Sequence, residues 1–171
     1  MKKNVTIKLV RAAVIAALYA SLTILLAPIS FNTTSLQVRV SEALTLLPLV
    51  FPEAIAGLTI GCFISNLITG NVFDIVFGSL ATLVAATVTY FVGRTIKTTW
   101  LKVMLGAIPP IAVNAFVVPL TYLKLSEIRE QYLIGIACVG AGQAIAVLVL
   151  GIPLYFAIAH YYKRKEEKNN A

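Results

Sequence analysis

Long apolar runs, most of them close to 20 residues and separated by charged or turn-forming residues, dominate this sequence. An α-helix needs about 20 apolar residues to cross a hydrocarbon core of about 30 Å. Only 12% of the 171 residues are charged, about half the share found in soluble domains, so a water-soluble fold would expose extensive apolar surface. We therefore expect an all-α integral membrane protein, multi-pass in the cell membrane, with residues 1–171 forming a single membrane domain.

The apolar runs predict six transmembrane helices. Their approximate bounds are residues 10–29, 37–51, 53–70, 74–93, 103–123 and 132–160. One division is open, because residues 43–70 could instead form one long helix and leave five spans. A Glu53 side chain beside Pro52 at mid-bilayer would be costly, and the residue before a proline resists the helical conformation.

The distribution of lysine and arginine favours six spans with both termini cytoplasmic. This topology places eleven basic residues inside and only Arg39, Lys124 and Arg129 outside, in line with the positive-inside tendency. Five spans would place six inside and eight outside. A cleaved signal peptide over residues 1–30 is disfavoured, because the apolar run lacks a clear small-x-small cleavage site and its removal would leave five spans. The net charge of +7 is thus an orientation signal, and we expect no nucleic-acid partner.

Motifs for catalysis and nucleotide binding are missing from the sequence. There is no Gly-x-x-x-x-Gly-Lys-Ser/Thr loop for ATP, and no His-Glu-x-x-His or Gly-x-Ser-x-Gly element in the spans. One histidine, His160, and two separated cysteines make no metal-ligand cluster. We therefore predict no enzymatic activity, no cofactor and no metal, and any ATP-driven step would need another chain.

Polar side chains within or beside the apolar runs are candidates for binding, because a polar group in hydrocarbon is costly. In the six-span topology they come from five different spans or their connections, and all can be reached from the outer half of the membrane. They predict a cup open to the outside. The candidates are Arg39, Glu42, Asn66, Asn71, Asp74, Asn114 and Gln143.

Most of these side chains also have a purely structural interpretation. Arg39 and Glu42 lie three residues apart and could form an ion pair on a helix surface. Asp74 could cap the helix that it begins. Asn114 could satisfy backbone freed by a proline kink, and Gln143 could hold two helices together. Their common side of the membrane is what favours one shared site.

The first span carries two rows of small residues at four-residue spacing. One row is Ala12, Ala16 and Ala20, and the other is Ala13, Ala17 and Ser21. Small residues let another helix approach closely in lipid. The rows could pack within this chain or form a docking face for a partner membrane subunit.

Two segments carry a family resemblance. They are Leu36-Gln-Val-Arg-Val-Ser-Glu-Ala-Leu-Thr-Leu-Leu-Pro and Gly70-Asn-Val-Phe-Asp-Ile-Val-Phe-Gly-Ser-Leu-Ala-Thr-Leu. With six spans, an alanine-lined first helix and no ATPase motif, the chain resembles the S components of energy-coupling factor (ECF) transporters, specifically the QueT branch. The resemblance covers essentially the whole chain, and its most specific element is Arg39–Leu44.

The resemblance implies a membrane subunit that captures a queuosine precursor, a 7-deazaguanine such as 7-aminomethyl-7-deazaguanine, from outside. It also implies a transmembrane coupling subunit, which meets the first helix, and two cytoplasmic ATPase subunits. Glu42 and Asp74 could share the ring donors and the protonated aminomethyl group, and which acid takes which role stays open. Amides would read the remaining edges, and Tyr122 or Phe31 could stack on the ring.

The segments 30–35 and 124–131 are expected to act as lids, because they are polar and long enough to move. Two other functions remain open at this stage. One is an S component for another small vitamin or amino acid. The other is a stand-alone carrier driven by an ion gradient, which often shows repeated halves that are not apparent here.

Overall fold

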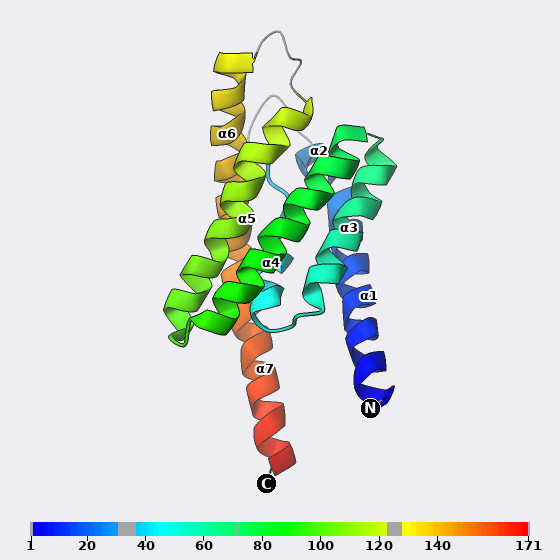
Figure 1. Ribbon diagram of the computed structural model, residues 1–171, viewed down its shortest axis with the longest axis vertical. Helices are drawn as coiled ribbons and strands as arrows, with labels where there is room; N and C mark the ends of the chain where they lie inside the picture. Colours follow the sequence, from blue (N-terminus) through cyan, green and yellow to red (C-terminus); the bar gives the residue numbers. More distant parts are fainter. Residues whose placement is uncertain (1, 31–36, 71, 123–127, 171) are drawn as a thin grey trace.

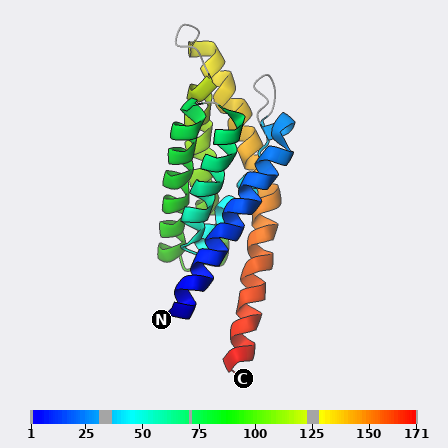
Figure 2. The ribbon, with the colours of Figure 1, turned by 90° about the vertical axis from the view of Figure 1, so that its right-hand side faces the viewer.

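The computed structural model describes residues 2–30, 37–70, 72–122 and 128–170. Every regular element within these ranges is helical. The elements are α1 (Lys2–Leu25), α2 (Ala27–Ser30), η1 (Val40–Leu49), α3 (Ala54–Thr69), η2 (Asp74–Gly78), α4 (Ser79–Thr95), α5 (Thr99–Tyr122), α6 (Ile128–Ala144), η3 (Ile145–Gly151) and α7 (Ile152–Asn170). η1 is a 3₁₀-helix, whereas η2 and η3 are π-helical segments that lead into α4 and α7. The helices form an elongated bundle with both chain termini at the same end (Figures 1 and 2).

Four helices of the bundle are long and apolar enough to cross a membrane. They are Val5–Leu25, Asp74–Thr95, Thr99–Thr121 and Gln131–Lys165. Large apolar side chains lie on the outside of the bundle, and Phe91 and Leu133 are 60% and 63% exposed. An apolar exterior of this kind suits lipid contact. The predicted all-α membrane class is confirmed, and these four helices coincide with four of the six predicted spans.

The second predicted span, 37–51, does not form a helix of membrane length. Residues 37–39 have no regular secondary structure, and η1 covers only ten residues, about 20 Å at the 3₁₀ rise of about 2.0 Å per residue. Eight of those ten residues, Ser41–Pro48, are buried. Irregular backbone is tolerated at membrane depth where protein encloses it, and η1 meets that condition.

η1 lies at the centre of the bundle, where it contacts α1, α3, α4, α5, η3 and α7. Leu44 and Leu47 belong to one apolar cluster, together with Leu58 of α3. Leu46 belongs to a second cluster, in which it packs with Val103 of α5. The three residues per turn of a 3₁₀-helix point successive side chains in three directions, so one short helix serves both clusters.

α1 packs along α3 through small residues. A Cβ added at Gly57 would lie 2.7 Å from the carbonyl oxygen of Ala12, and one at Gly61 would lie 2.7 Å from the carbonyl oxygen of Ala16. These separations are too short for a side chain. The two glycines therefore let the helix backbones touch, as small-xxx-small patterns do in lipid.

This packing separates the two alanine rows of the first span. Ala16 and Ala20 are only 6% and 7% exposed, because their row faces the interior of the bundle. Ala12 of the same row is half-buried, and α3 packs against this row, which favours its interpretation as packing within the chain. Ala13 and Ala17 lie on another side of α1 and are exposed, so only their row remains available to a partner.

At the end of the bundle that carries the termini, one arginine joins three elements. Arg11 of α1 forms an ion pair with Glu53, Nη1 to Oε1 at 3.0 Å, just before α3. Its guanidinium also lies 4.7 Å from the ring centroid of Phe51 and 5.0 Å from that of Tyr162 on α7. Such cation–π contacts are favourable, and they tie α1 and α7 to the turn after η1.

We expect Gly61→Leu to lower the thermal unfolding temperature of the purified chain in detergent. The new side chain must push α1 away from α3, and overpacking of this kind costs about 1–3 kcal/mol. Ala17→Leu is the matched control, because it adds a similar side chain to an exposed face of α1 and should leave the unfolding temperature unchanged. An unaltered Gly61→Leu protein would contradict the close packing of α1 on α3.

Candidate functional site

Several buried polar side chains of the bundle form a cluster around η1. Six of the seven polar candidates of the sequence analysis belong to it, and each is at most 5% exposed. They are Arg39, Glu42, Asn66, Asp74, Asn114 and Gln143. The structure thus brings together residues that are up to about 100 positions apart in the sequence. Their role in binding a ligand stays a prediction.

Glu42, in the first turn of η1, is surrounded by uncharged polar side chains from three helices. The Tyr19 hydroxyl of α1 donates to Oε1, and Asn114 of α5 donates from Nδ2 to Oε2 at 3.2 Å. The side chain of Gln143 on α6 also lies close enough to interact with Glu42. Neutral donors solvate a carboxylate without cancelling its charge, so an ionised Glu42 is a negative centre inside the bundle.

Asp74, the first residue of η2, has a different environment. Its Oδ2 lies 3.7 Å from Nη2 of Arg39, and its Oδ1 accepts a hydrogen bond of 2.8 Å from the Thr121 hydroxyl. Asn66 donates from Nδ2 to the Asp74 carbonyl oxygen at 2.9 Å. The Asp74 carboxylate is therefore neutralised by a cation from the chain itself. Arg39 is in turn anchored by a bond from Nε to the Ser30 carbonyl oxygen.

The charges of this cluster do not balance. Arg39 interacts electrostatically with Glu42 as well as with Asp74, so one cation faces two carboxylates. When all three groups are ionised, the formal sum is −1. An uncompensated charge in an apolar interior is unfavourable, and the cluster therefore favours a partner that brings a positive charge or several hydrogen-bond donors.

One glycine on α6 allows the chain before η1 to enter the bundle. A Cβ at Gly142 would lie 1.8 Å from the carbonyl oxygen of Gln37, so no other residue fits there without moving the backbone. This contact also sets the position of the adjacent Gln143. Among the described residues, Oε1 of Gln143 has no hydrogen-bond partner although it is buried. A buried acceptor without a partner calls for an explanation, and a donor on a ligand supplies one.

Both π-helical segments lie beside the cluster. η2 begins at Asp74, and η3 begins two residues after Gln143. π-helical turns are often found at functional sites, because they displace side chains from their regular positions. Within η2, a Cβ at Gly78 would lie 3.0 Å from Nδ2 of Asn66 and 3.3 Å from Oδ1 of Asp74, so the glycine leaves room for the polar contact.

Several predicted residues cannot be placed in the site. Asn71 and Phe31 lie outside the described residues. Tyr122 ends α5, but its side chain is not described. Of the predicted lids, residues 31–35 and 124–127 lie outside the described ranges, whereas Ser30 ends α2 and residues 128–131 begin α6.

Two residues of the cluster were missed in the sequence analysis. Tyr19 contacts Glu42 and is fully buried, and Thr121 contacts Asp74. Tyrosine and threonine are common in membrane helices, so their residue type carries little information. The available signal was the position of Tyr19, whose hydroxyl lies in mid-span among alanines.

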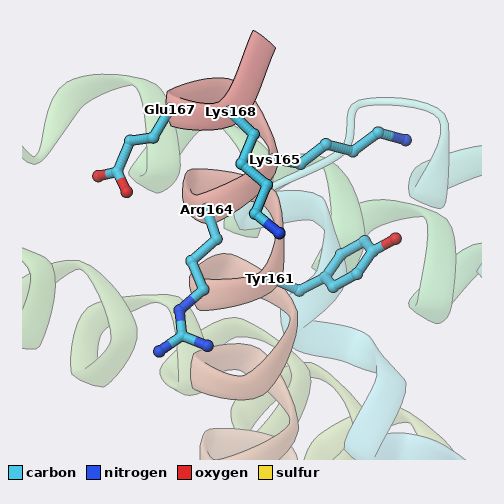
Figure 3. Close-up of a pocket in the computed structure, with 5 residues that line it drawn as sticks. All are labelled: Tyr161, Arg164, Lys165, Glu167 and Lys168. Atoms are coloured by element: carbon cyan, nitrogen blue, oxygen red, sulfur yellow. The ribbon is translucent and has the colours of Figure 1, made fainter. Parts of the chain in front are cut away.

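A large surface hollow lies elsewhere, along the end of α7. It measures about 700 Å³, and the described residues that line it all come from that helix: Tyr161, Arg164, Lys165, Glu167 and Lys168. Figure 3 shows these side chains projecting from a single helix. No other described element encloses the hollow, so we do not assign it a ligand. Within the described ranges, no group of three or more His, Cys, Asp or Glu side chains could hold a metal ion.

Long apolar helices around a buried polar cluster define the chain as a multi-pass membrane protein with a polar interior, the class that includes solute transporters. Comparison with known proteins identifies the family. The model of the QueT transporter family matches residues 9–160, and the chain belongs to that family. It is therefore a member of a transporter family.

A curated relative supports this assignment. "Queuosine precursor transporter QueT" of Lactococcus lactis subsp. cremoris (strain MG1363) is 38% identical over 84 residues, which cover 49% of this chain and 50% of the relative. The alignment thus spans about half the length of each protein. No solved structure matches the chain.

The ion pair between Arg39 and Asp74 can be tested by a double-mutant cycle. We expect Asp74→Asn to destabilise the chain by about 3–5 kcal/mol, because it leaves a buried guanidinium without its partner. Arg39→Gln combined with Asp74→Asn should cost clearly less than the sum of the two single substitutions. The measurement is thermal or denaturant unfolding in detergent, and strictly additive costs would show that the two charges do not interact.

Proposed function

We propose that the protein is the substrate-binding membrane subunit, or S component, of an ATP-driven ECF importer. In this proposal it captures a queuosine precursor of the 7-deazaguanine type from outside the cell. Membership of the QueT transporter family and the name of the Lactococcus lactis relative support the substrate class. The observation that carries the proposal is the buried cluster in which a single arginine, Arg39, lies near two acids, Glu42 and Asp74.

The two acids have different roles in this proposal. Asp74 is already paired with Arg39, so it holds the segment before η1 against η2. Glu42 has uncharged partners and receives the protonated aminomethyl group of the ligand. The charge-assisted bond that results is about twice as strong as a neutral one. The buried Oε1 of Gln143 accepts an N–H of the ring.

The orientation belongs to the same proposal. We infer six crossings with both termini cytoplasmic in one membrane domain, and the second crossing consists of residues 37–39 and η1. The shared end of the two termini (Figure 1) supports an even number of crossings, and the split of eleven basic residues to three supports the inward direction. The ligand then enters from the end of the bundle opposite the termini.

The energy for import comes from other chains in this proposal. The sequence contains no Gly-x-x-x-x-Gly-Lys-Ser/Thr motif. In this proposal two cytoplasmic ATPase subunits supply the nucleotide sites, and a transmembrane coupling subunit connects them to this chain. The exposed row of Ala13 and Ala17 on α1 is the proposed contact for the coupling subunit. A smooth row of small side chains permits close helix contact in lipid.

Glu42→Gln should weaken binding of 7-aminomethyl-7-deazaguanine to the isolated protein by about thirtyfold or more. Removing one partner of a buried charged pair costs about 2 kcal/mol or more, and isothermal titration calorimetry in detergent measures the change. Glu167→Gln, on the exposed end of α7, is the matched control and should bind normally. Wild-type affinity in Glu42→Gln would show that the carboxylate does not recognise the ligand.

Uptake into vesicles tests the energy source. We expect the purified chain alone to give no accumulation of the precursor. The complex with the coupling and ATPase subunits should accumulate it only when ATP is present on the side of the membrane that carries the ATPase subunits. Accumulation by the chain alone, driven by an ion gradient, would identify a secondary carrier instead. Mass spectrometry of small molecules that copurify with the chain distinguishes a 7-deazaguanine from another vitamin or an amino acid.

A further inference from the structure

We propose that Gln37, on the irregular segment before η1, determines specificity for the ligand. Its side-chain oxygen Oε1 accepts a hydrogen bond from the exocyclic 2-amino group of the 7-deazaguanine ring. This inference rests on the proposed function, because it takes the ring and its aminomethyl group as given. Gln37 is not among the candidates of the sequence analysis, and it adds a contact at the other end of the ligand from Glu42.

The amide of Gln37 is buried and held in one orientation. Gln37 is 5% exposed, and its Nε2 donates to the carbonyl oxygen of Ser30 at 2.8 Å. The same carbonyl oxygen accepts from Nε of Arg39 at 3.2 Å. Turning the amide around would place its oxygen against the Ser30 oxygen, where neither atom can donate. The bond therefore fixes Oε1 as an acceptor that points away from Ser30.

This acceptor has no donor within the part of the chain that the structure describes. Oε1 of Gln37 is buried without a hydrogen-bond partner, and the same is true of Oε1 of Gln143 and of the Ser30 hydroxyl. Few buried polar groups of native proteins are unsatisfied, because each one is costly. Three of them in one region indicate a group that comes from outside the chain.

Two contacts connect these three groups to one another. The Ser30 carbonyl accepts the hydrogen bond from the Gln37 side chain. The backbone of Gln37 touches α6, since a Cβ at Gly142 would lie 1.8 Å from the Gln37 carbonyl oxygen, and Gln143 is the next residue along that helix. Gln37 therefore lies at the border of the polar cluster that contains Gln143.

The unpartnered groups match one edge of a guanine-type ring in number and kind. That edge carries two neighbouring donors, N1–H and the 2-amino group, beside the carbonyl oxygen O6. The oxygens of Gln37 and Gln143 can accept from the two donors, and the Ser30 hydroxyl can donate to the carbonyl. An adenine-type ring has an acceptor at N1, which would meet another acceptor here. The chemistry therefore favours a 2-amino-oxo ring.

The position of Gln37 assigns it the 2-amino end of the ring. Gln37 is bonded to Ser30, whereas Glu42 is bonded to Tyr19. These two partners are eleven residues apart along α1 and α2, which corresponds to about 16 Å of helical rise. Figure 1 shows α2 near the end of the bundle opposite the termini. The 2-amino group lies across the ring system from the 7-aminomethyl group, so an ammonium group at Glu42 directs the 2-amino group towards Gln37.

Binding of two ligands by the full-length protein in detergent tests this inference. One is 7-aminomethyl-7-deazaguanine, and the other is 7-aminomethyl-7-deazahypoxanthine, which lacks only the 2-amino group. We expect wild type to bind the second ligand at least about tenfold more weakly, because the oxygen of Gln37 then stays buried without a donor. Isothermal titration calorimetry measures both affinities.

Gln37→Met removes the amide but keeps an unbranched side chain of similar length. This variant should bind the guanine ligand about tenfold more weakly than wild type, and its affinities for the two ligands should differ by less than about twofold. Gln143→Met is the matched comparison. It should weaken both ligands by a similar factor and keep the tenfold preference, because both ligands carry the N1–H that Gln143 accepts.

Thr89→Val is the control for the general loss of a buried polar group. The Thr89 hydroxyl is fully buried and already donates to the Gly106 carbonyl oxygen at 3.0 Å, so its removal should change the affinity for neither ligand. Thermal unfolding of each variant shows whether it is folded.

Three results would overturn the proposal. Equal affinity of wild type for the two ligands would show that the 2-amino group is not recognised, and this result depends on no variant. A tenfold preference that persists in Gln37→Met would assign the recognition to another group. Loss of the preference in Gln143→Met alone would assign it to Gln143. If wild type binds neither ligand, the proposed function itself fails, and this outcome is distinct from the other three.

Discussion

The enclosure of charged side chains in an apolar bundle is the constraint on which the rest of this structure depends. Arg39, Glu42 and Asp74 lie in the interior, at most 5% exposed, where an unpartnered charge is far more costly than in water. Partners for these groups come from α1, α3, α5 and α6, so the helices are positioned around the polar cluster as well as around the apolar ones. Glycines at 57, 61, 78 and 142 provide the space for these contacts.

The cluster divides into a part that maintains the fold and a part that is chemically unfinished. The pair of Arg39 and Asp74 is complete, because each charge has its counterpart and Thr121 adds a further bond. Glu42 and Gln143 are not complete, since the hydrogen bonds to Glu42 come from uncharged donors and Gln143 has an acceptor without a described partner. Under the proposed function, these two unfinished groups are the ones that meet the ligand.

Much of this organisation could be predicted from the sequence, and the part that could not has a physical cause. Apolar length and the depth of polar residues identified the membrane class and the set of side chains that meet in the cluster. The 3₁₀ conformation of η1 was not predicted. An apolar run of about 15 residues indicates a membrane helix, whether that segment contacts lipid or is buried in protein. Residue spacing does not encode tertiary packing. It therefore could not predict the ion pair between Arg39 and Asp74 or the close contact of Gly61 on α3 with Ala16 on α1. Tyr19 escaped notice because tyrosine is common in membrane helices and its residue type alone does not indicate a polar contact.

The shortness of η1 has a consequence for biosynthesis. Ten residues of 3₁₀-helix and the sixteen of α3 are each too short to span a hydrocarbon core of about 30 Å as a regular helix. Neither segment is therefore expected to leave the translocon for lipid as an independent span, and η1 in addition carries Glu42. In the proposed six-crossing topology the two must therefore enter the membrane together as a hairpin, and Glu42 becomes enclosed by protein only when the later helices pack around it. Residues 40–69 are thus expected to reach their final positions late in assembly, even though they are synthesised early.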